Sequence, residues 1–92
     1  MNEINSLDSY RTSDTSLAAY LFTEGYQIID IDYSNPRAEF VFKNNSPNLT
    51  ESVRLYSIGK TSVDAATYAR LHRKLTKIVV NQTPWTEGVI NA

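Results

Sequence analysis

The sequence predicts an α+β fold: a two-stranded antiparallel β-hairpin packed by three helices, in the order α-β-β-α-α. Three observations support this prediction. The segment SDTSLAAYLFTEG has an apolar stripe at helical spacing and ends in glycine. The segment QIIDIDYSNPRAEFVFK then changes to the two-residue period of strands joined by a turn. The chain after the hairpin returns twice to helical spacing, which provides helices to cover its apolar face.

Length and composition set the domain organisation. The chain has 92 residues, 41% of them hydrophobic, which suits one globular domain. We expect a flexible N-terminal arm over residues 1–12, the domain over 13–82 and an irregular C-terminal tail over 83–92. No signal peptide or membrane span is visible, and cysteine is absent. We therefore expect a cytoplasmic protein that has no contact with a membrane.

The first helix is predicted from its cap, its stripe and its stop. The hydroxyl of Ser13 or Thr12 is the expected N-cap, and Asp14 then lies where the helix dipole favours negative charge. Gly25 is expected to end the helix in the left-handed conformation. The apolar stripe consists of Leu17, Ala18, Leu21 and Phe22.

The hairpin is predicted over residues 27–33 and 38–43, joined by the turn Ser34-Asn35-Pro36-Arg37. Strict alternation assigns its side chains to two faces. The core face is expected to hold Ile29, Ile31, Tyr33, Phe40 and Phe42. Asp30 and Asp32 fall on the other face, where we expect them to keep the surface polar.

Two further helices follow the hairpin. Ser46-Pro47 is a typical helix start, and Gly59 a typical stop, for a short helix whose stripe is Leu49, Val53 and Tyr56. A longer helix is expected over about Ala65 to Val80, capped by Asp64 or Thr61. Its predicted buried face consists of Tyr68, Leu71, Leu75, Ile78 and Val79.

Charge is distributed unevenly along the chain. Residues 1–34 contain six acids and one base, a charge of −5, and residues 35–86 contain eight bases and three acids, a charge of +5. Such asymmetry is consistent with a nucleic-acid face, with self-association or with pairing inside the domain.

The candidate binding residues are a basic stripe on the last helix, formed by Arg70, Arg73, Lys74 and Lys77. Their i, i+3, i+4, i+7 spacing places all four on one face. Three interpretations stay open. The stripe is a solvated surface that complements the helix dipole, a track for phosphates, or a surface for an acidic protein partner.

Trp85 is the second candidate. A tryptophan in a tail with proline and glycine either folds back over the domain or anchors a partner or a second copy of the chain.

Catalysis is not expected. His72 is the only histidine, no glycine-rich phosphate loop is present, and serine, histidine and acids occur without a nucleophile motif. A metal site would need carboxylates alone. We therefore predict no enzymatic activity, no metal and no cofactor.

One resemblance adds to these inferences. The string S-D-x-x-L-A-A-Y-L at Ser13–Leu21, followed by Gly25-Tyr26, Phe40-Val41-Phe42 and Val63-Asp64, resembles a small family of unknown function from tailed-phage, prophage and bacterial genomes. The resemblance covers about Thr12 to Val79. It implies a phage-associated cytosolic accessory protein and assigns no activity and no functional residues.

The sequence therefore predicts a non-catalytic binding or adaptor protein, associated with phages or mobile elements, that acts through protein–protein contacts. The partner is another protein or a second copy of the chain. The alternative is a nucleic-acid-binding accessory protein that uses the basic stripe.

Overall fold

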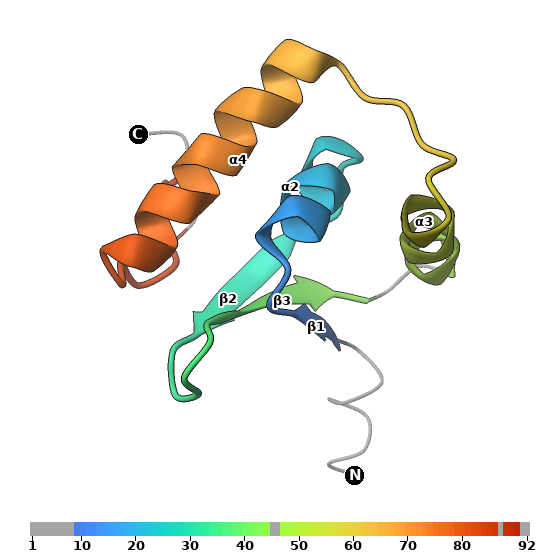
Figure 1. The fold of residues 1–92 in the computed structure, drawn as a ribbon. Coiled ribbons are helices and arrows are strands. Elements are labelled where there is room, and N and C mark those ends of the chain that lie inside the picture. The colour runs from blue at the N-terminus through green and yellow to red at the C-terminus, as the bar shows by residue number, and fades with distance from the viewer. Residues whose placement is uncertain (1–8, 45–46, 87, 91–92) are drawn as a thin grey trace, which may run out of the picture.

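A small antiparallel sheet carries the helices on one side (Figure 1). The structure is a computed structural model and describes residues 9–44, 47–86 and 88–90. Within them the α+β class and three helices are confirmed, but the sheet has three strands and the order is β-α-β-β-α-α. The elements are β1 (Ser9–Thr12), α2 (Thr15–Thr23), β2 (Ile28–Asp32), β3 (Glu39–Lys43), α3 (Asn48–Ser57) and α4 (Ala65–Val80).

The third strand, β1, comes from residues that the sequence analysis assigned to the flexible arm. It pairs antiparallel with β3, with Tyr10 opposite Phe42 and Thr12 opposite Phe40, so β3 is the central strand of the order β1-β3-β2. The physical reason is that a hairpin alone would leave the outer backbone groups of β3 without partners, and β1 provides them. Residues 1–8 of the predicted arm lie outside the described residues.

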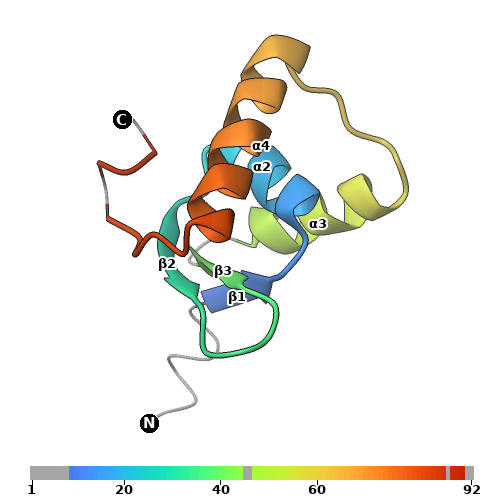
Figure 2. The ribbon, with the colours of Figure 1, turned by 60° about the vertical axis from the view of Figure 1, so that its left-hand side comes forward.

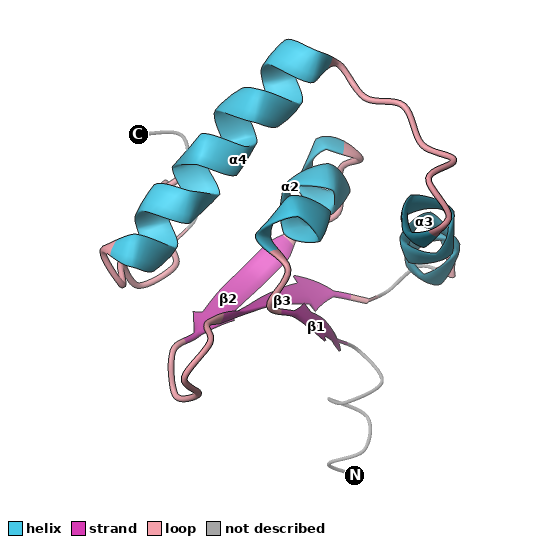
Figure 3. Cartoon of the chain, viewed as in Figure 1, coloured by secondary structure: helices cyan, strands magenta, loops and turns pink. Residues whose placement is uncertain are grey.

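The core lies between the sheet and the helices, which Figure 3 shows on the same side of the strands. The apolar side chains of β2 and β3 that face the helices are almost fully buried. They pack with α2, which is buried along its length, and with the buried faces of α3 and α4. The core cluster includes Leu17, Leu21, Ile28, Ile31, Phe40, Phe42, Leu49, Leu71, Leu75 and Ile78.

The prediction that Ile29 belongs to the core is wrong. The pairing of β2 with β3 shifts between Ile28 and Asp30, which is a β-bulge at Ile29. The extra residue breaks the two-residue alternation, so Ile28 is 3% exposed and Ile29 is 46% exposed. Ile31 and the phenylalanines of β3 keep their predicted places in the core.

The outer face of the sheet is mostly polar. Val41 lies on this face and is buried, because Arg11 starts opposite it in the β1–β3 register and reaches across β3. The Arg11 guanidinium contacts Asp32 at 2.9 Å and Glu39 at 3.3 Å. Hydrogen bonds from Ser34, together with Arg11, lower the pKa of Asp32 to about 2.

The helix ends follow the local signals closely. Asp14, not Ser13 or Thr12, caps α2, because its carboxylate accepts from the N–H groups of Ser16 and Leu17. Asp64 caps α4 as one of the two predicted residues. Gly25 and Gly59 have φ values of 96° and 73° and close α2 and α3 as predicted.

The start of α3 lies one residue after the predicted first helical residue, Pro47. The helix begins at Asn48 after Pro47, whose own side chain makes no capping hydrogen bond. Ser46, the expected cap, lies outside the described residues. No helix in the described part of the chain is long and apolar enough to cross a bilayer.

Candidate functional site

The basic stripe lies along one flank of α4. The side chains of Arg70, Arg73 and Lys77 are exposed, whereas Lys74 is partly buried. The structure therefore keeps the four predicted residues on one helix but gives them two environments. Three cations project into solvent, and the fourth turns toward the C-terminal tail.

The described acidic residues form no ion pair with the exposed cations. Within the described ranges, the ion pairs join Arg11 to Asp32 and Glu39, and Arg54 to Glu51. None involves Arg70, Arg73 or Lys77. Internal pairing therefore does not account for the charge asymmetry at these three positions.

The tail returns along α4 (Figure 2). A turn begins it: the Gln82 N–H donates to the Val79 carbonyl and the Thr83 N–H to the Ile78 carbonyl, each at 3.0 Å. Gln82 has a φ of 52°, which residues other than glycine seldom adopt. Further along, Ile90 is 5% exposed and belongs to the core cluster.

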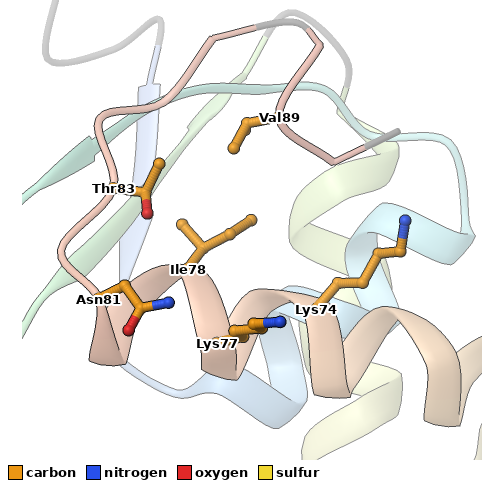
Figure 4. Close-up of a pocket in the computed structure, with 6 residues that line it drawn as sticks. All are labelled: Lys74, Lys77, Ile78, Asn81, Thr83 and Val89. Atoms are coloured by element: carbon orange, nitrogen blue, oxygen red, sulfur yellow. The ribbon is translucent and has the colours of Figure 1, made fainter. Parts of the chain in front are cut away.

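Between α4 and the tail lies a groove of about 300 Å³, which we call the tail groove (Figure 4). Ile78 and Val89 face it from opposite sides, while Lys77 and Asn81 lie along its α4 edge. The ammonium group of Lys74 donates to the Ile90 carbonyl at 3.0 Å. The lining residues are Lys74, Lys77, Ile78, Asn81, Thr83 and Val89.

Sequence reasoning identified part of this site. Lys74 and Lys77 line the groove, whereas Arg70 and Arg73 extend the positive surface beyond it. The apolar wall and the polar residues Asn81 and Thr83 were missed because they depend on the path of the tail. The pair Val89-Ile90, two adjacent aliphatic residues in the tail, was the available signal.

Trp85 does not line the groove. It is partly buried and packs against the core cluster, as Val89 does. This contact agrees with the interpretation that the tail folds back over the domain.

A second hollow, of about 380 Å³, lies between α2 and α4, borders the stripe at Arg73 and is lined by Ser16, Tyr68, Ala69, His72 and Arg73. The Ser16 hydroxyl lies 3.3 Å from Nε2 of His72, and the Tyr68 hydroxyl donates to the Ser16 carbonyl. Among the described residues no carboxylate bonds the other His72 nitrogen. The pair joins α2 to α4, and it lacks the orienting acid that a Ser-His-Asp triad requires.

Metal ligation finds no support in the described part of the chain. No group of three or more histidine, cysteine, aspartate or glutamate side chains there is arranged to hold an ion.

Comparison with known proteins gives the family. The model of a domain of unknown function, DUF5659, matches residues 7–81. The chain belongs to the DUF5659 family. The match covers every helix and strand of the structure and ends just after α4, so the tail that closes the groove lies outside the DUF5659 match. Neither a curated protein nor a solved structure matches the chain.

Proposed function

We propose that this DUF5659 protein is a non-catalytic binding module that recognises an acidic segment of a protein partner through the basic stripe of α4. The observation that carries the proposal is the group of three exposed cations, Arg70, Arg73 and Lys77, that have no ion pair in the described residues. Like charges on adjacent turns of a helix repel one another, and an acidic partner relieves that repulsion.

Nucleic acid is the alternative ligand, and the net charge of the chain argues against it. Domains that bind nucleic acid are commonly basic as a whole, with isoelectric points above about 9. This chain has a net charge of −1 and an isoelectric point near 5.7. The proposal keeps the cytoplasmic location and the phage or mobile-element association that the sequence features and the resemblance imply.

Capture of partners from the native cell tests the proposal. The tagged full chain should retain a protein partner after nuclease treatment, and Arg70→Glu with Arg73→Glu should lose it. The matched control, Arg37→Glu with Lys60→Glu, makes the same charge change at exposed positions away from α4.

Two outcomes would overturn the proposal. Loss of the captured protein on nuclease treatment favours the nucleic-acid alternative, which also requires affinity that falls steeply with salt. Equal capture of the protein partner by the variant of Arg70 and Arg73 and by the control variant excludes the stripe as the binding surface. Sedimentation of the purified chain tests whether the partner is a second copy.

A further inference from the structure

We propose that the tail groove binds an aliphatic side chain of the partner, flanked in its sequence by aspartate or glutamate. This inference rests on the proposed function and specifies its ligand. The groove combines two chemistries in a small volume: Ile78 and Val89 provide apolar walls, and Lys77 and Asn81 provide polar donors at the edge. At about 300 Å³ it lies at the lower end of the range for ligand pockets, which suits one side chain.

Lys77 makes the site selective for negative charge. Its side chain is exposed and forms no ion pair with a described residue, so a carboxylate beside the bound side chain meets a cation without displacing a partner. An exposed ion pair alone adds little affinity. Burial of an aliphatic group in the groove therefore contributes most of the affinity, and the carboxylate contributes specificity.

The lining residues argue against a nucleotide in this groove. Bases bind single-strand sites by stacking on aromatic rings, and none of the described residues that line the groove is aromatic. Arg70 and Arg73 lie outside the groove, so among the described residues a phosphate there would meet no guanidinium group.

The length of the stripe favours a peptide over a small carboxylate. Arg70 lies seven residues before Lys77, about 10 Å along the helix axis. An extended peptide covers that distance in about three residues. A segment with its aliphatic residue in the groove therefore brings an acid three residues away to Arg70. A small carboxylate would contact only the groove, without Arg70.

Amide chemical shifts of the ¹⁵N-labelled full chain test the inference. The first probe is the acetylated and amidated peptide EEELEEE, and the second replaces its leucine by serine. We expect saturable shifts at Lys77, Asn81, Thr83 and Val89 with the leucine peptide, and about tenfold weaker binding with the serine peptide because the apolar contact is lost. Lys77→Gln should weaken binding, and the exposed control Lys60→Gln should not.

The outcomes separate this inference from the proposed function. Equal affinity for the two peptides, with shifts confined to Arg70 and Arg73, overturns the groove assignment and leaves the acidic partner standing. No saturable shift on α4 with either peptide overturns both. If 4-methylpentanoate binds the groove as tightly as the leucine peptide, the ligand is a small carboxylate and the peptide assignment is wrong.

Discussion

The hydroxyl of Tyr33 donates a hydrogen bond of 2.7 Å to the carbonyl oxygen of Thr83, 50 residues further along the chain. The same hydroxyl lies 3.3 Å from the carbonyl of Ile78. Burial, with a contribution from Asp30, raises the pKa of Tyr33, so the phenol keeps its proton at neutral pH and remains a donor. The end of β2 thereby holds the first residue of the tail against α4.

Removal of this hydroxyl should loosen the tail. We expect Tyr33→Phe to lower the free energy of unfolding by about 1 kcal/mol, because two carbonyl groups lose a donor. Trp85, the single tryptophan, reports on the tail, and its emission maximum should move to longer wavelength as its exposure to water increases. Urea unfolding and fluorescence of the folded variant measure the two effects.

Tyr26→Phe is the matched control. It removes a hydroxyl that contacts the Ser52 hydroxyl at 2.9 Å, between α2 and α3 and away from the tail. Its emission spectrum should equal that of the parent chain. An unchanged spectrum in Tyr33→Phe as well would contradict the role of Tyr33 in holding the tail.

Local signals in the sequence were sufficient to predict the helices. A glycine that adopts positive φ ends a helix wherever it falls, so Gly25 and Gly59 give two ends directly. Asp64 likewise determines the start of α4 through its bonds to Thr67. These effects act within a few residues, so a short segment of sequence contains the signal, although the cap of α2 is Asp14 and not the predicted Ser13 or Thr12.

Non-local pairing was not predictable in the same way. The four residues of β1 are too few to show a period, and only the free edge of β3, some 30 residues away, makes them a strand. The tail groove has the same origin. Helical spacing places the basic stripe on one face of α4. The wall of the groove opposite α4 depends on where Tyr33 and the core hold the tail.

The carboxyl group of Asp32 should make the free energy of unfolding depend on pH. Its pKa is lowered from 3.8 to about 2, so the folded state favours the ionised form. This contribution is fully present above the unfolded pKa, about 3.9, and is lost as the pH falls toward 2. We expect Ser34→Ala, which removes the hydroxyl donor at 2.6 Å, to raise the pKa of Asp32 toward its ordinary value. Carboxyl ¹³C titration measures it.

The control for this titration is Ser62→Ala, a serine substitution in the connection between α3 and α4. It should leave the Asp32 titration unchanged. If Ser34→Ala also leaves it unchanged, the hydroxyl of Ser34 is not the main cause of the lowered pKa, and the Ser34 N–H, which donates to Asp32 at 2.9 Å, and the Arg11 guanidinium account for it.

The bulge in β2 determines which of two adjacent isoleucines supports the core. Ile28 is buried and pairs in register with Phe42, whereas Ile29 is displaced toward solvent. We expect Ile28→Ala to cost about 2–5 kcal/mol, because it opens a cavity beneath the helices, and Ile29→Ala to cost about 0.5 kcal/mol. Urea unfolding of both variants measures the difference. Strict alternation along β2 would place Ile29 in the core and reverse the order of the two costs, so the pair of variants decides between a bulged and a regular strand.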